Sequence, residues 1–284
     1  MKPKERSIAV RRLADFAVRG IASLAAIAGI AFLVWILYVV LARGISAINW
    51  DFFTHRPAPP GMEGGGMASA IVGTLLMTGF AMLIGIPAGL MAGIYLSEFG
   101  RYTRIGEGVR FTCNMLMGTP SIIVGVFVYI LMVVPTKTFS GYAGAISLAI
   151  IMLPVVTRTT EDMLSLVPAT LRESALALGA PRWKVTLGVV FRAARNGLIT
   201  GTLLAVARVS GETAPLLFTA LNSPYWPSSL KEPTSNLTVT IFNYAMSPYP
   251  DWQAMAWGAS FLITVGVLGI TLFTRTLLWF RSYR

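Results

Sequence analysis

The sequence has few of the residues from which metal sites and catalytic clusters are built. It holds one cysteine, Cys113, one histidine, His55, and only 12% charged residues, compared with ~25% in soluble domains. One cysteine excludes an internal disulfide, and one histidine excludes a histidine-rich metal site. No Gly-Lys pair occurs, so the chain has no nucleotide-binding P-loop of its own. We therefore expect no catalytic residues, no metal ligands and no cofactor.

The sequence is instead rich in long apolar runs. The chain has 284 residues, 55% of them apolar, and a mean hydropathy of +0.68. A helix of about 20 apolar residues crosses a bilayer. Six such runs occur, at residues 20–42, 64–97, 111–136, 138–157, 197–221 and 252–274. The first run is longer than a signal-peptide core of ~7–15 residues. The sequence predicts an all-α polytopic membrane protein with six transmembrane helices, the first of which is retained.

The charge distribution predicts the orientation of these six spans. The loops on the side of the N-terminus carry 18 of the 23 lysines and arginines, and the opposite side carries four, namely Arg43, Arg56, Lys137 and Lys231. Cytoplasmic loops are enriched in Lys and Arg, so both termini are predicted to be cytoplasmic. The net charge of +11 then reflects orientation and contact with a lipid bilayer, and indicates no nucleic-acid partner.

The same topology divides the chain into segments. These are a basic cytoplasmic N-terminus (1–19), a first transmembrane helix (20–42), a periplasmic loop (43–67), a five-helix core (68–274) with a cytoplasmic loop (158–195) and a periplasmic loop (221–251), and a cytoplasmic tail (275–284).

Two charged residues, Arg208 and Glu212, lie inside the fifth apolar run. An arginine at bilayer depth costs about 2.5–3.5 kcal/mol on insertion scales, so it normally faces a bundle interior or a polar path. Residues four apart share one face of a helix and can pair. A stripe of Gly197, Gly201 and Ala205 on the same helix permits close approach of a second helix. Two interpretations stay open: a structural ion pair that locks two helices, or an ion-handling point in a transport path.

The third apolar run is interrupted by Gly118-Thr119-Pro120-Ser121. Threonine before proline predicts a helix start, with Thr119 as the N-cap and Pro120 as the first helical residue. A helix that starts inside a membrane points free N–H groups at anions, as the discontinuous helices of transporters do. The alternative is an ordinary entry turn near one interface.

A short amphipathic segment lies within the cytoplasmic loop. Pro168 is placed near a helix start, and Gly179 is a plausible C-terminal stop. The next apolar helix begins at Val185. A short helix, a glycine turn and the start of a second helix would form a protrusion, here called the knob, between two spans. Such a knob could pack on the membrane or in the groove of a partner protein.

Residues of this knob resemble a known family. Glu173-Ser174-Ala175, followed after three residues by Gly179, is similar to the EAA-x3-G loop of binding-protein-dependent ABC transporter permeases, and Pro181 and Trp183 fit as well. The family pattern continues with Ile-x-Leu-Pro, whereas this chain has Val189-Val-Phe191-Arg192 and lacks the proline. Three further segments, Ile94–Phe99, Leu153–Glu161 and Ala207–Ala220, resemble the permeases of Pst-type phosphate importers.

The resemblance implies a MetI-like ABC importer permease bundle in the bacterial cytoplasmic (inner) membrane. It also implies four partners: a homologous permease, a dimer of ATP-binding subunits that hydrolyses the ATP, a periplasmic phosphate-binding protein, and phosphate as substrate. The residues Glu173, Ser174, Ala175, Gly179, Pro181 and Trp183 would then form the ATPase-coupling loop. Arg208 would meet phosphate transiently, Glu212 would hold Arg208, and Ser210, Thr213, Thr119 and Ser121 would line the substrate path.

Three other functions compete with this interpretation. A permease for another tetrahedral oxyanion shares all of these features. An ATPase-independent secondary transporter would leave the knob at residues 173–179 without a partner. Inverted repeats would favour such a transporter, and the sequence shows no convincing repeat. A membrane enzyme lacks support, because no cluster of His, Cys, Asp and Glu suggests a metal or nucleophile site.

Overall fold

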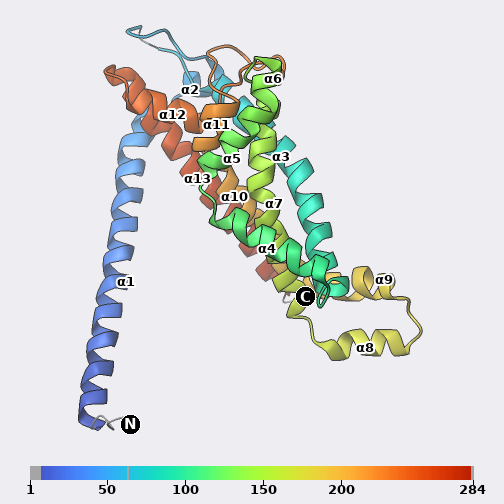
Figure 1. Ribbon diagram of the computed structural model, residues 1–284. Coiled ribbons are helices and arrows are strands. Elements are labelled where there is room, and N and C mark those ends of the chain that lie inside the picture. Colours follow the sequence, from blue (N-terminus) through green and yellow to red (C-terminus); the bar gives the residue numbers. More distant parts are fainter. Residues whose placement is uncertain (1–7, 63, 283–284) are drawn as a thin grey trace, which may run out of the picture.

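The computed structural model describes residues 8–62 and 64–282, and within these ranges the chain is helical with no β-strand. The helices are α1 (Ile8–Gly44), α2 (Trp50–Thr54), α3 (Ala68–Ile94), α4 (Arg104–Gly118), α5 (Ser121–Val128), α6 (Val134–Thr136), α7 (Gly141–Ser165), α8 (Ala169–Ala177), α9 (Arg182–Lys184), α10 (Phe191–Ser210), α11 (Ala214–Thr219), α12 (Leu237–Ala245) and α13 (Pro250–Ser282) (Figure 1). A 3₁₀ turn follows α1 at Ile45–Ala47, and π-helical turns lie at Tyr95–Phe99, Tyr129–Val133 and Val185–Val190.

Five helical segments are long and apolar enough to cross a membrane. These are Arg12–Ala47, Ala68–Phe99, Gly141–Ser165, Arg182–Ser210 and Pro250–Phe273. A sixth span exists if Arg104–Gly118 and Ser121–Thr136 count as one, since the pair passes the same test but bends by 104° at its break. The break falls at the predicted interruption. The expected all-α polytopic architecture is confirmed, with the third span broken.

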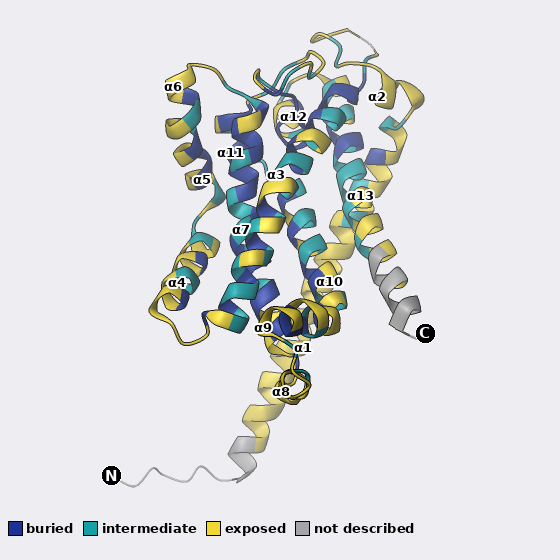
Figure 2. Ribbon diagram, turned by 90° about the vertical axis from the view of Figure 1, so that its right-hand side faces the viewer, coloured by how far each residue is buried: buried dark blue, intermediate teal, exposed yellow. Residues whose placement is uncertain are grey.

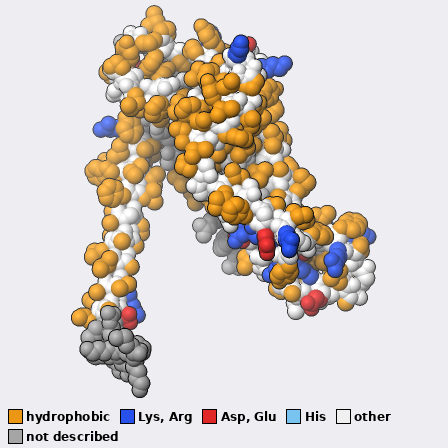
Figure 3. Space-filling model, in the orientation of Figure 1, with side chains coloured by type: hydrophobic (Ala, Val, Ile, Leu, Met, Phe, Trp, Pro, Cys, Tyr) orange, Lys and Arg blue, Asp and Glu red, His pale blue; other side chains and the backbone are white. Residues whose placement is uncertain are grey.

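Helix α1 lies apart from the rest of the bundle. It starts at Ile8, earlier than the predicted span at Gly20, and the apolar window of its span is 0% buried. Near its end it packs on α13, where the Arg43 guanidinium lies 5.2 Å from the Trp257 ring centroid. Figures 1 and 2 place the start of α1, the end of α13 and α8 toward one end of the molecule. Charged side chains gather around α8 at this end (Figure 3).

A parallel seam between α3 and α7 forms the centre of the bundle (Figure 2). Gly85 lies against Met152, Gly89 against Val156, and Gly93 against Thr160. The repeat of small residues every four positions removes the side chains that would separate the two helices. The buried core around this seam includes Met77, Leu148 and Met152.

Filling this seam is expected to destabilise the protein. A Cβ atom at Gly89 would lie 2.7 Å from Val156 Cβ, so Gly89→Val forces α3 and α7 apart. Overpacking of this kind costs about 1–3 kcal/mol, which should appear as a lower Tm of the purified protein in detergent. Gly79→Val on the same helix is the matched control, because a Cβ there meets nothing within 4 Å. Equal Tm values for the two variants would contradict the seam.

Helix α10 packs antiparallel on α7 through the predicted stripe of small residues. A Cβ at Gly197 would meet Met163, and one at Gly201 would meet Thr159, while Ala205 is fully buried. The expected close approach of a second helix is therefore confirmed, with α7 as that helix.

The segment predicted as loop 221–251 contains a helix, α12. Its N-cap Asn236 accepts a hydrogen bond from the backbone N–H of Val239 at 2.8 Å. The Tyr244 ring stacks on Trp252 of α13 with 4.2 Å between centroids. Burial raises the pKa of Tyr244 to about 12, so its phenol stays neutral. This capped and stacked helix closes the end of the bundle opposite α8 (Figure 1).

Candidate functional site

The predicted knob is a separate helical loop at one end of the bundle, here called the docking loop (residues 166–184). Pro168 precedes α8, which has nine residues and buries none of them. Gly179 follows with φ +81°, and its N–H donates to Leu176 O at 2.9 Å. A residue with a left-handed backbone conformation after a helix is usually glycine, because glycine has no Cβ to clash with the backbone. The predicted start at Pro168 and stop at Gly179 are confirmed.

The docking loop exposes apolar side chains beside polar ones. Leu178 is 89% exposed and Trp183 is 59% exposed. The sequence-predicted residues Glu173, Ser174, Gly179 and Pro181 are also exposed, and Ala175 is half-buried against the cluster around Leu164 and Val185. Exposed apolar groups rimmed by polar residues mark a protein or membrane contact.

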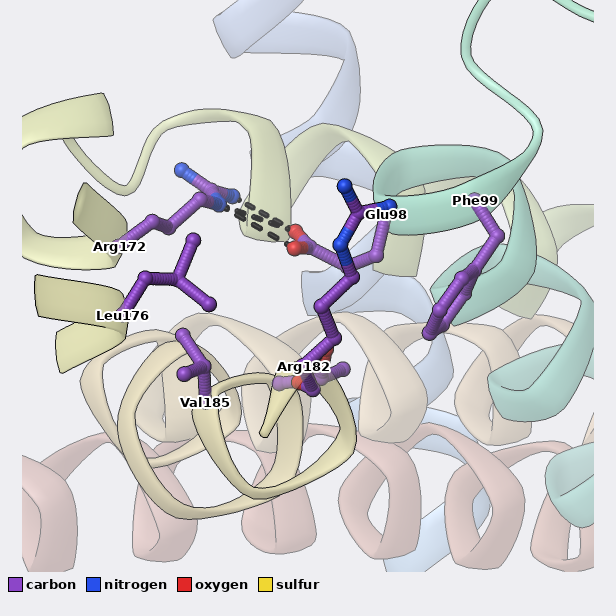
Figure 4. Close-up of a pocket in the computed structure, with 7 residues that line it drawn as sticks. Glu98, Phe99, Arg172, Leu176, Arg182 and Val185 are labelled. Carbon is purple, nitrogen blue, oxygen red and sulfur yellow. Dashed lines mark hydrogen bonds and ion pairs between the residues drawn. The ribbon is translucent and has the colours of Figure 1, made fainter. Parts of the chain in front are cut away.

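Arg172 attaches the docking loop to the end of α3. Its Nη2 lies 2.8 Å from Glu98 Oε1, and its Nε lies 3.2 Å from Oε1 and 3.3 Å from Oε2. Nη2 also donates to Leu164 O at 2.7 Å, and Nη1 donates to Val167 O. Figure 4 shows the pair at a cleft of about 270 Å³ whose wall includes Leu176. Sequence analysis missed this contact, because its partners lie 74 residues apart.

A second buried carboxylate, Glu161 of α7, holds two arginines. Arg110 of α4 donates to its Oε1 at 2.6 Å, and Arg158 donates to its Oε2 at 3.2 Å. Arg110 also donates to Leu96 O at 3.0 Å. From the sequence, these arginines are predicted only as charges of cytoplasmic loops. The one signal in the sequence was a glutamate, Glu161, close to an apolar run, because a buried carboxylate needs a charged partner.

The predicted i, i+4 ion pair of Arg208 and Glu212 is wrong. Helix α10 ends at Ser210 with Gly211 as its C-cap, so the two side chains do not share a helical face. Among the residues that the structure describes, no ion pair joins them. Glu212 is half-buried and its carbonyl oxygen accepts from Thr238 Oγ1 at 2.9 Å, while Arg208 is exposed. Proline at position 215 explains the break, since it has no N–H to continue the hydrogen bonds of α10 and instead lies in the first turn of α11.

Thr119 is not the N-cap of α5, which also corrects a prediction. Its Oγ1 donates back to Met115 O at 2.7 Å, and α5 starts at Ser121 after Pro120. The N-cap residue of α5 is Pro120, and no side chain caps this helix.

Helix α5 of the broken third span packs against α11, which follows α10. A Cβ at Gly125 would lie 2.6 Å from Pro215 Cα, so the helices lie in close contact. Ser121 begins α5, and Thr213 is the N-cap residue of α11. Ser210 Oγ donates to Val206 O at 2.8 Å. The structure therefore places the middle of α5 against the first turn of α11, just beyond the end of α10. No group of three metal-ligating residues occurs in the described ranges.

A helical bundle with one broken span and an exposed docking loop is typical of a membrane transport component. Residues 85–278 match the family of the binding-protein-dependent transport system inner membrane component. The chain belongs to this family and, within it, to the PstA permeases. It is 47% identical to the phosphate transport system permease protein PstA of Yersinia pestis over 88% of this chain and 84% of the relative. It is also 47% identical to the PstA protein of Haemophilus influenzae over 90% of both chains.

A solved structure shares the fold. A chain of the inward-facing MetNI methionine ABC transporter superposes with a TM-score of 0.55 at 18% identity, covering 74% of this chain and 89% of that one. The likeness supports the MetI-like bundle that the sequence resemblance implied. The protein is thus a multi-pass inner-membrane permease.

Proposed function

We propose that this chain is the permease subunit of an ATP-driven phosphate importer. It forms the translocation path with a second, homologous permease, and a dimer of ATP-binding subunits drives it through the docking loop. A periplasmic phosphate-binding protein delivers the substrate. The observation that carries the proposal is the 47% identity, over about nine-tenths of the chain, to proteins named as phosphate transport permeases. The exposed docking loop at one end supports it.

Arg208 is the cation that meets phosphate in this proposal. It lies in a span, it is exposed, and its side chain has no partner among the described residues. An unpaired arginine at membrane depth is unfavourable against lipid, so it faces a polar path at the contact with the second permease. Ser121 and Thr213, whose hydroxyls have no partner in the described ranges, donate to phosphate oxygens. Thr119 and Ser210 already donate to carbonyls, so they offer the path only acceptor oxygens.

The docking loop is the surface for the ATP-binding subunit. Leu178 and Trp183 supply apolar contact, and Glu173, Ser174 and Pro181 surround them. A short exposed helix with apolar anchors fits a groove on a partner. The other end, with α2 and α12, then receives the phosphate-binding protein.

The orientation of the spans is testable with reporter fusions. The charge asymmetry places both termini, the docking loop and the 275–284 tail in the cytoplasm. Fusions of alkaline phosphatase after Ala42, Lys137 and Lys231 should be active, since that enzyme folds only outside the cytoplasm. Fusions within residues 158–195 should be inactive and should give signal with a cytoplasmic reporter. An inactive phosphatase after Lys231 contradicts the orientation.

Phosphate uptake in cells tests the function. A bacterium that lacks its own phosphate importers and carries the companion subunits should regain uptake of labelled phosphate when this chain is expressed. Uptake should disappear when the ATP-binding subunit is omitted. Uptake that survives that omission favours a secondary transporter. Competition by sulfate or molybdate as strong as that by phosphate would instead identify a permease for another oxyanion.

A further inference from the structure

Two buried carboxylates hold arginines at the end of the bundle that carries the docking loop. The side chains of Glu98 and Glu161 are 10% and 11% exposed. Glu98 lies in the π-helical turn Tyr95–Phe99 that ends the α3 span, and Glu161 lies on α7. A carboxylate with so little exposure is normally paired with a cation. Arg172 and Arg110 supply those pairs, at 2.8 Å and 2.6 Å.

The Arg172–Glu98 pair connects the docking loop to a helix that is not adjacent to it in the chain. The loop is covalently continuous with α7 on one side and α10 on the other, and α8 buries no residue. In the described parts of the chain, no other side-chain hydrogen bond or ion pair joins residues 166–184 to α3 or the turn after it. The guanidinium forms a fork onto one carboxylate (Figure 4), a geometry that resists rotation as well as separation.

The turn at Tyr95–Phe99 is held from a second direction. Arg110 of α4 donates to Leu96 O, two residues before Glu98, and to the carboxylate of Glu161. The turn is therefore bonded to the docking loop through Glu98 and to α4 through Leu96 O. Arg110 of α4 is in turn bonded to Glu161 of α7. Breaking a buried pair leaves a charge without a partner in a low-dielectric site, so these elements resist separation.

We propose that the Arg172–Glu98 pair is the mechanical link that carries movement of the docking loop to the end of the α3 span and, through the hydrogen bond from Arg110 to Leu96 O, to α4. Helix α4 leads directly to the 104° bend before Ser121. A displacement of the docking loop therefore reaches the interrupted helix without passing along α7 or α10. Arg172 and Glu98 are positioning residues in this step and contact no substrate. The role in transport rests on the proposed function; the attachment of the loop does not.

Spin-label distances test the attachment without any substrate. In a Cys113→Ala background, labels on Tyr102→Cys and Leu178→Cys, both residues being 89% exposed, report the distance from the turn after α3 to the docking loop. We expect a narrow distribution with Glu98 present and a broad one with Glu98→Gln. Glu107→Gln, an exposed carboxylate on α4, is the control and should leave it narrow. An unchanged distribution in Glu98→Gln overturns the link.

Coupling is tested in proteoliposomes that hold the whole complex, by the ratio of phosphate imported to ATP hydrolysed. With Glu98→Gln, we expect hydrolysis to continue and the ratio to fall at least about fivefold, the lower end of common coupling between sites. Glu107→Gln should keep the ratio. A merely structural pair would instead lower complex yield, import and hydrolysis together. A normal ratio in Glu98→Gln overturns the role in transport.

A reversible tether separates the link from general damage. Glu98→Cys with Arg172→Cys, in the Cys113→Ala background, removes both charges and should show the low ratio. Bridging the two thiols with a short bis-methanethiosulfonate reagent should restore the ratio, and reduction should abolish the rescue. A bridged complex that stays uncoupled overturns the proposal. A wild-type complex that imports no phosphate overturns the proposed function instead, and the spin-label distances still decide the attachment.

Discussion

Replacing Arg208 by glutamine is expected to lower phosphate uptake about 10- to 100-fold, because a hydrogen bond to a charged group contributes about 1.5–3 kcal/mol. The complex should still assemble, since the Arg208 side chain is exposed and holds no partner in the described chain. Arg208→Lys should keep part of the activity, because lysine retains the charge but not the planar fork that grips two phosphate oxygens. The measurement is initial uptake of labelled phosphate at equal amounts of subunit in the membrane.

Glu212 supplies the decisive control for this prediction. Because the structure shows no ion pair between the two residues, Glu212→Gln should retain most of the uptake. The double variant should then match Arg208→Gln alone, since independent sites add. A structural pair behaves differently: each single change leaves one buried charge unpaired, and the double change restores function. Restored uptake in the double variant would contradict the role of Arg208 in the anion path.

Gly179→Val is expected to abolish uptake by changing the end of α8. The φ of +81° is a left-handed conformation that costs other residues about 1–2 kcal/mol, and a β-branched residue avoids it most strongly. The change should re-aim Leu178 and Trp183 and release the ATP-binding subunit. Membrane insertion should survive, because the position lies outside the spans. Co-purification of the ATP-binding subunit and phosphate uptake are the two measurements.

Gly179→Asn separates backbone geometry from added bulk. Asparagine tolerates the left-handed region, and a Cβ at this position meets nothing within 4 Å. Uptake should therefore largely survive in Gly179→Asn. Gly188→Ala, where a Cβ also meets nothing within 4 Å, is the control in the π-helical turn that follows the docking loop. Normal uptake and full retention of the ATP-binding subunit in Gly179→Val would contradict the docking role.

The features that sequence predicted correctly depend on local chemistry. Pro168 and Gly179 bound a helix because one has no N–H and the other tolerates positive φ. Gly197, Gly201 and Ala205 repeat at helical spacing, so the close approach of a second helix follows from the sequence without knowledge of which helix it is.

The features that could not be predicted from the sequence are breaks within apolar runs and contacts between residues far apart in the chain. Residues 197–221 look like one continuous apolar helix, and only Pro215 signalled the break that separates Arg208 from Glu212. Helix α12 within the predicted loop had its cap, Asn236, as a local signal. The pairing of Arg172 with Glu98 had none, because it depends on how the folded docking loop places Arg172 beside the turn after α3.

ATP-dependent import by the reconstituted complex tests the central claim most directly. Proteoliposomes would contain this permease, the companion permease and the ATP-binding dimer, with ATP inside and the phosphate-loaded binding protein outside. We expect labelled phosphate to accumulate in the lumen only when both ATP and the binding protein are present, and to stay out when ADP replaces ATP. Equal accumulation with ADP, or accumulation driven by an ion gradient alone, would contradict the proposed importer.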